Sequence, residues 1–220
     1  MATHIPPAIA KIAPDGNLTP RQTRHFMINM LKRRVRSGTG SSQEFLHRRT
    51  AMNPWPDLRP ILNGIKWVIV GGVATRAYMP ERMTKDLDIL AHQNNKDTVL
   101  TKLQQAGYQI IEQLAIPGFS LRSPEGAEVD VLFRNDTWLK DALNQPAYDS
   151  AGYPVISLPY LILLKMDAQR AQDWADISRM LGLASDSELD AVRAVVAQYT
   201  PEDSEDLESL IFIGKQEHNS

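Results

Sequence analysis

The chain has 220 residues, of which 43% are hydrophobic and 23% charged, a balance typical of globular proteins and not of disordered or fibrous ones. The formal net charge of −2 predicts no polyanionic partner from overall charge, and the absence of cysteine excludes disulfides and thiolate metal sites. The apolar runs are too short to span a bilayer, and prolines and charged residues occupy the place of a signal peptide's apolar core. We therefore expect a cytoplasmic protein with no membrane contact.

Charge is distributed unevenly along the chain. Residues 1–50 contain nine Lys or Arg residues and two acids, whereas the rest of the chain is acidic. This basic arm fits two hypotheses: it binds nucleic acid through the phosphates, or it docks on the acidic body or on a second subunit. The lack of aromatic residues among the basic ones favours docking.

The N-terminal region, residues 1–56, is predicted to be a helical arm. An extended leader covers residues 1–18, and Thr19-Pro20 marks a helix start because Thr caps and Pro fits the first turn. A second short helix is expected over 41–51, where Ser41 and Glu44 resemble a capping box.

Residues 57–150 alternate between strand and helix signals, and residues 151–220 read as a helical region. The expected elements are one or two helical turns over 57–63, strands over 66–70, 86–90 and 108–111, helices over 73–79 and 96–106, and a hairpin of 119–122 with 128–133. Helices follow over 158–170, 173–181 and 186–199, with a weaker one at the end. This order predicts an α+β (α/β-like) fold, a mixed sheet with flanking helices.

Three acids carry the chemistry that we predict. Asp86 and Asp88 point to the same face of a strand, where two ionised carboxylates repel each other unless a cation lies between them. Asp130, between Val129 and Val131 on the next strand, adds a third carboxylate. Carboxylates suit Mg²⁺ or Mn²⁺, and such a site serves phosphoryl or nucleotidyl transfer. Glu128, two residues before Asp130, is either a further acid or the rim of this site.

Gly71 and Gly72 follow the first strand, thirteen residues before Asp86. Glycines at a strand-to-helix turn let backbone N–H groups approach a phosphate. Each feature alone is a weak signal, but their order along the chain is difficult to obtain by chance.

The string Val70-Gly71-Gly72, Asp86-Leu-Asp88-Ile and Val129-Asp130-Val131 resembles the signature of the polymerase-β-like nucleotidyltransferases. Arg82-Met-Thr84-Lys-Asp86 looks like the form found in minimal nucleotidyltransferases and AbiEii-type toxins, and residues 164–177 are similar to a Lys-x-x-Ala-x-Arg-x-x-Asp-x-x-Asp-Ile helix of those groups. The resemblance covers residues 64–182.

The resemblance implies a role for each matched residue. Asp86, Asp88 and Asp130 bind metal, Asp130 also assists deprotonation of the acceptor, and Gly71 and Gly72 hold the β- and γ-phosphates of a nucleoside triphosphate (NTP). Arg82 meets the triphosphate or balances the acids, and Thr84 hydrogen-bonds a carboxylate. Lys165 reaches a phosphate or, with equal weight, pairs with Asp130 or Asp86. For Asp173 and Asp176, capping and solvation are favoured over positioning Arg170 or Lys165.

The predicted activity is transfer of a nucleoside monophosphate (NMP) from an NTP to a hydroxyl of RNA or tRNA, of a protein, or of a small molecule such as an aminoglycoside. A toxin role would add an antitoxin partner. The alternative is an inactive nucleotidyltransferase fold that binds a nucleotide or a protein.

Overall fold

The structure is a computed structural model that describes residues 7–15, 17, 19–34, 55–80, 84 and 86–218. Strands form one seven-stranded sheet in the order β3-β4-β5-β2-β1-β7-β6. The strands are β1 (Trp67–Ile69), β2 (Asp86–His92), β3 (Gln109–Gln113), β4 (Gly118–Arg122), β5 (Glu128–Arg134), β6 (Ala147–Tyr148) and β7 (Pro154–Val155). Because parallel and antiparallel pairs occur in the same sheet, the sheet is mixed.

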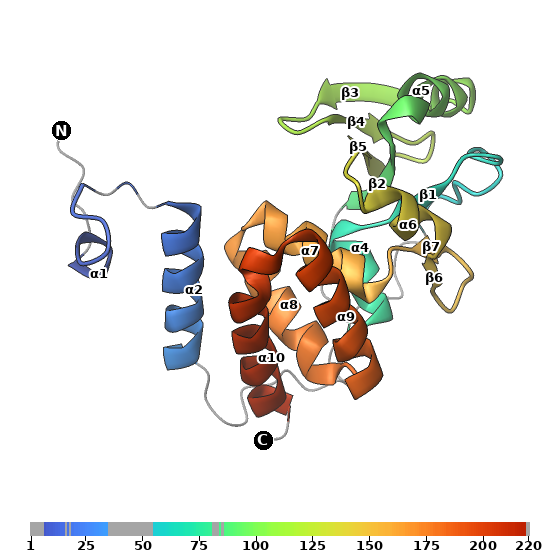
Figure 1. Cartoon of the computed structure of the whole chain (residues 1–220). Helices are drawn as coiled ribbons and strands as arrows, with labels where there is room; N and C mark the ends of the chain where they lie inside the picture. The colour runs from blue at the N-terminus through green and yellow to red at the C-terminus, as the bar shows by residue number, and fades with distance from the viewer. Residues whose placement is uncertain are drawn as a thin grey trace.

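Helices make up most of the remaining described chain. They are α1 (Pro7–Ala10), α2 (Pro20–Arg34), α4 (Gly71–Ala74), α5 (Lys96–Gln105), α6 (Leu139–Asn144), α7 (Leu158–Ala168), α8 (Ala171–Leu183), α9 (Asp186–Tyr199) and α10 (Ser204–His218), with 3₁₀ turns η1 (Thr75–Ala77), η2 (Gln93–Asn95) and η3 (Pro201–Asp203). Helices α7 to α10 gather beside the sheet, and α2 lies against this group next to α10 (Figure 1). The α+β class predicted from the sequence, a mixed sheet with flanking helices, is confirmed.

The hairpin prediction is also confirmed, because β4 and β5 pair antiparallel across a turn at 123–127. The centre of the sheet is the parallel pair β2–β5, with Asp88 opposite Asp130 in the register. Its inward residues Leu87, Ile89 and Val131 are at most 1% exposed, so the apolar half of each strand anchors the pair in the core.

Several local predictions are wrong. Residues 7–10 of the expected extended leader form the short helix α1. Over 57–63 one helical turn forms, closed by the Leu62 N–H donating to the Leu58 carbonyl oxygen at 2.8 Å, but no α-helix follows from it. The helix expected over 73–79 starts at Gly71 and becomes 3₁₀ at Thr75. In each case the segment is too short for side-chain periodicity to outweigh the packing around it.

The sequence reading missed α6, β6 and β7. Strand β7, inside the region expected to be only helical, pairs parallel with β1 and antiparallel with β6. Two-residue strands leave no alternation to detect. The weak final helix is α10, and the short helix expected over 41–51 lies outside the described residues. Within the described part of the chain, no helix is both long and apolar enough to traverse a lipid bilayer.

Candidate active site

Strand pairing brings the three predicted acids together. Carboxylate oxygens of Asp86, Asp88 and Asp130 all lie within 4.8 Å of one another, and all three residues are partly buried. Asp86 and Asp88 share one face of β2 because side chains two residues apart point the same way. The parallel register with β5 then sets Asp130 beside Asp88, so neighbouring strands supply one acidic cluster.

The glycine turn reaches the same cluster through β1. The Val70 N–H donates to the carbonyl oxygen of Asp88 at 2.9 Å, which places Gly71 beside the Asp88 side chain. Gly71 has a φ of 63°, and a Cβ there would lie 1.9 Å from Asp88 Oδ2. Both the backbone conformation and the close carboxylate therefore require glycine at this position.

Burial and mutual repulsion make the cluster unfavourable when fully ionised. Burial, followed by the charges of Asp86 and Asp130, raises the pKa of Asp88 to about 7. Burial also raises the pKa of Asp130, where a hydrogen bond from Ser120 opposes the effect and the charges of Asp86 and Glu128 add to it. None of the three acids pairs with a cationic side chain of a described residue. Arg170 only partly offsets the charge at Asp88, so among the described residues the cluster has the oxygen donors and the excess negative charge that a divalent cation would satisfy.

The acids open into a cleft of about 1130 Å³. Residues from the glycine turn, β2, β5, the loop 114–117, and the α7–α8 junction line it, among them Gly71, Gly72, Thr84, Lys165 and Arg170. The Thr84 hydroxyl donates to Asp86 Oδ1 at 3.2 Å, the carboxylate contact expected for this residue. Arg82 lies outside the described residues.

Lys165 pairs with Asp173 and Asp176, the less favoured alternative of the sequence analysis, in which these two acids position Arg170 or Lys165. Its Nζ lies 2.8 Å from Asp173 Oδ1 and 2.8 Å from Asp176 Oδ2, and not beside Asp130 or Asp86. The capping and solvation role favoured for Asp173 and Asp176 is wrong, since both residues are 0% exposed. Both residues lie on the face of α8 that meets α7. The spacing of two acids along the chain does not show which face of a helix is buried, so their burial could not be predicted.

A second charged group borders the cleft and was missed. Arg134, at the end of β5, donates to Asp136 at 2.6 and 2.9 Å and to Asp167 at 2.8 Å. The hydrogen bonds with Asp136 raise the pKa of the Arg134 guanidinium above the ordinary arginine value. The signal that could have found Arg134 is its position four residues after Asp130, on the same strand face.

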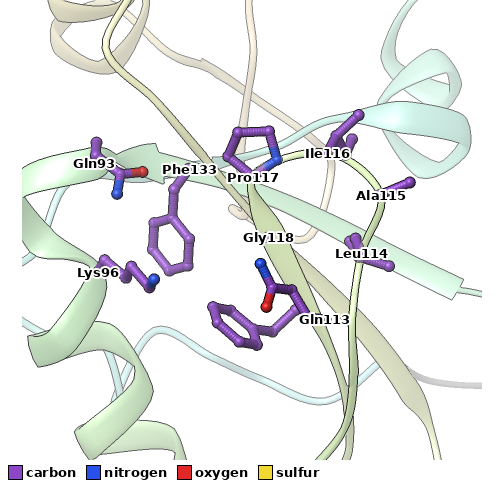
Figure 2. Close-up of a pocket in the computed structure, with 10 residues that line it drawn as sticks. Gln93, Lys96, Gln113, Leu114, Ala115, Ile116, Pro117, Gly118 and Phe133 are labelled. Atoms are coloured by element: carbon purple, nitrogen blue, oxygen red, sulfur yellow. The ribbon is translucent and has the colours of Figure 1, made fainter.

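A smaller pocket of about 270 Å³ adjoins the cleft (Figure 2). The two share Gln93, Phe133 and the loop 114–117. Lys96 Nζ lies 5.0 Å from the ring centroid of Phe119 in its wall. Other aromatic side chains are in contact with neighbours in the fold: the ring centroids of Trp138 and Tyr160 lie 6.0 Å apart, and the Arg59 guanidinium carbon lies 4.1 Å from the ring centroid of Tyr153. Trp67 and Trp174 are buried in the core.

Comparison with known proteins supports the nucleotidyltransferase prediction. Residues 62–149 match the family model described as aminoglycoside-2''-adenylyltransferase. No functionally curated protein matches the sequence. An adenylyltransferase is a nucleotidyltransferase, so the predicted enzyme class is confirmed by this match, whereas the AbiEii branch is not shown.

Three solved structures illustrate the similarity. ANT(2'')-Ia in complex with adenylyl-2''-tobramycin is 16% identical, covering 67% of this chain and 87% of its own, with a TM-score of 0.36. The Cid1 poly(U) polymerase is 15% identical, covering 75% of this chain and 46% of its own, with a TM-score of 0.31. The Megavirus polyadenylate synthase is 12% identical, covering 96% and 48%, with a TM-score of 0.39.

Proposed function

We propose that the chain is a Mg²⁺-dependent nucleotidyltransferase that moves an NMP from an NTP to an acceptor hydroxyl and releases pyrophosphate. The observation that carries the proposal is the convergence of Asp86, Asp88 and Asp130 within 4.8 Å, beside a glycine turn and inside a large cleft. Mg²⁺ held by these three carboxylates would neutralise the triphosphate and orient its α-phosphorus.

The chain's own residues then have separate tasks. Asp130, whose pKa burial raises, is suited to accept the proton of the acceptor hydroxyl. The hydroxyl oxygen forms a bond to the α-phosphorus while the bond to the bridging oxygen breaks, so that pyrophosphate leaves with that electron pair. The backbone at Gly71 and Gly72 allows close approach of the phosphates, because no side chain stands in the way.

We infer that the acceptor is a hydroxyl-bearing, cationic small molecule. The support is that residues 62–149 match the aminoglycoside-2''-adenylyltransferase family model, and aminoglycosides are molecules of this kind. Charge in the cleft supports this choice. Among the described lining residues, five are aspartates and three are Lys or Arg, so the wall carries excess negative charge. Mg²⁺ would offset this charge for the NTP, but the NTP–Mg²⁺ complex is itself anionic, so the loaded cleft would attract a cationic acceptor and repel the phosphates of RNA.

The proposal is tested by incubating the protein with α-labelled NTPs and Mg²⁺ in separate reactions with tobramycin, total RNA and protein extract. We expect label on the small molecule, abolished by EDTA. Label on RNA or protein instead would overturn the acceptor assignment and favour the toxin hypothesis with its antitoxin partner. Metal-independent NTP binding without transfer would favour the inactive binding module.

Asp88→Asn and Asp86→Asn are each expected to lower the transfer rate on the order of 100-fold or more, because the site loses electrostatic stabilisation. Asp97→Asn, an exposed acid on α5, is the matched control and should keep the wild-type rate. Full activity in Asp88→Asn would contradict the site.

A further inference from the structure

The lysine of the cleft wall is already paired with two carboxylates. Lys165 Nζ contacts Asp173 and Asp176 at 2.8 Å each, and these three side chains are at most 4% exposed. A buried ammonium with two carboxylates is strongly held, since separating it would leave charges unpaired in the interior. The one remaining N–H group of Lys165 belongs to a side chain that is only 4% exposed, so the lysine is poorly placed to meet a phosphate in the cleft.

Arg170 lies at the exposed end of the same charge cluster. It precedes α8 as the capping residue, directly after Gln169, whose φ of 56° turns the chain sharply between α7 and α8. The Arg170 side chain is 70% exposed and lines the cleft together with Gly71 and Asp88. The turn thus brings a cation from the helical region to the acidic site.

Asp173 connects the two cations. Its Oδ1 accepts hydrogen bonds from Lys165 Nζ at 2.8 Å and from Arg170 Nη2 at 3.3 Å, and its Oδ2 accepts from Arg170 Nε at 2.6 Å. Lys165 therefore holds the carboxylate that orients Arg170. The third guanidinium nitrogen, Nη1, makes no hydrogen bond with any described residue.

The other guanidinium in the cleft is differently placed. All three nitrogens of Arg134 donate to Asp136 or Asp167 at 2.6 to 2.9 Å. Of the described cations that line the cleft, Arg170 is the most exposed: its side chain is 70% exposed, against 31% for Arg134 and 4% for Lys165. An oriented guanidinium with a spare N–H group suits phosphate oxygens better than a point charge does.

We propose that Arg170 binds the β,γ-diphosphate part of the NTP, and that Lys165 and Asp173 are positioning residues that hold its guanidinium at the cleft. This inference rests on the proposed function, because it needs an NTP at the acidic cluster. It assigns the triphosphate contact to a residue other than the lysine expected from the sequence.

The test measures binding of a non-hydrolysable NTP and of the matching NMP by calorimetry, with Mg²⁺ present. Arg170→Ala should weaken NTP binding about 10- to 100-fold, the loss typical of a charge-assisted hydrogen bond, and leave NMP binding unchanged. Arg170→Lys should restore part of the affinity. Arg193→Ala is the matched control, because Arg193 Nε also lies 2.6 Å from a carboxylate, that of Glu208, but does not line the cleft.

Asp173→Asn tests the positioning role. Its NTP affinity should fall less than that of Arg170→Ala, and the double variant should bind no more weakly than Arg170→Ala alone, because both changes act on one contact. Additive losses would overturn the positioning role. If circular dichroism shows that Asp173→Asn does not fold, Lys165→Arg replaces it in the comparison of single and double variants, because that change keeps the buried charge.

The outcomes separate this inference from the proposed function. Wild-type protein that binds no NTP in the presence of Mg²⁺ would overturn both. If the wild-type protein and the Arg170→Ala variant bind NTP equally well, the inference is overturned and the proposed function stands.

Discussion

Asp88 is the residue at which burial and charge conflict most directly. It lies between two other carboxylates, its pKa is raised to about 7, and the backbone of Gly72 donates a hydrogen bond that only partly offsets this. A carboxylate in such a position is more costly to ionise in the folded chain than in the unfolded one. Stability of the metal-free protein must therefore depend on pH.

We expect Asp88→Asn to stabilise the metal-free protein at neutral pH. The folded pKa is raised above the ordinary value of 3.8, so the stability linked to protonated Asp88 is fully present below pH 4 and is lost as the pH rises through 7. Relative to wild type, the variant should gain about 2–4 kcal/mol in free energy of unfolding between pH 4 and pH 8. Denaturant titrations in EDTA at both pH values check this, and parallel pH profiles would contradict it.

Among the elements, α8 and α10 make an unusually close contact. A Cβ on Gly214 would lie 2.0 Å from the carbonyl oxygen of Ser178, and one on Gly182 would lie 2.4 Å from the carbonyl oxygen of Gly214. These are backbone atoms of a packed helix, so they do not move aside as a flexible side chain would. The two glycines therefore set the distance between the helices.

Gly214→Ala is expected to lower the free energy of unfolding by about 1–3 kcal/mol, because overpacking forces the helices apart. The comparison variant is Phe212→Ala on the same helix, which removes a larger side chain from a position that is 59% exposed. Thermal denaturation of the two variants should show the greater loss for the single added methyl group. A larger loss in Phe212→Ala would contradict the close packing.

Element patterns explain which parts of the fold could be predicted. The amphipathic helices α5 and α9 and the hairpin β4–β5 were found because each repeats its apolar positions several times. In α9 the Ser185–Glu188 capping box also marks the start of the helix. Strands β6 and β7 have no such repeat and depend on pairing with β1.

For the molecule as a whole, ion pairs attach α2 to the C-terminal helices in addition to the apolar packing of Ile28, which is buried in the core. Arg24 on α2 lies 3.3 Å from Asp203 and 3.5 Å from Asp206, with side chains 15%, 7% and 17% exposed. Burial raises the pKa of both acids, and Arg24 opposes that shift. This part of the basic arm is thus docked on the acidic C-terminal region, the second of the two roles considered for it.

Arg24→Ala should loosen α2 from the body, because two mostly buried carboxylates lose their cation. Limited trypsin digestion should then cut within residues 20–34 faster than in wild type, while residues 57–218 stay resistant. Lys11→Ala, which removes an exposed cation and trypsin site outside α2, is the control. Equal cleavage of all three proteins would show that the ion pairs do not hold α2.

The amino-acid sequence by itself indicated the three acids, the glycine turn and the strands that carry them, because strand alternation and a strand-to-helix turn are local properties of the chain. The enzyme class followed from the resemblance of these motifs to a known family. Only the tertiary structure decided the partners of the charged residues. Lys165 pairs with Asp173 and Asp176 because the turn at Gln169 folds α8 back beside α7, which buries the two acids. Burial and pairing depend on which segments meet, and that is a property of the whole fold.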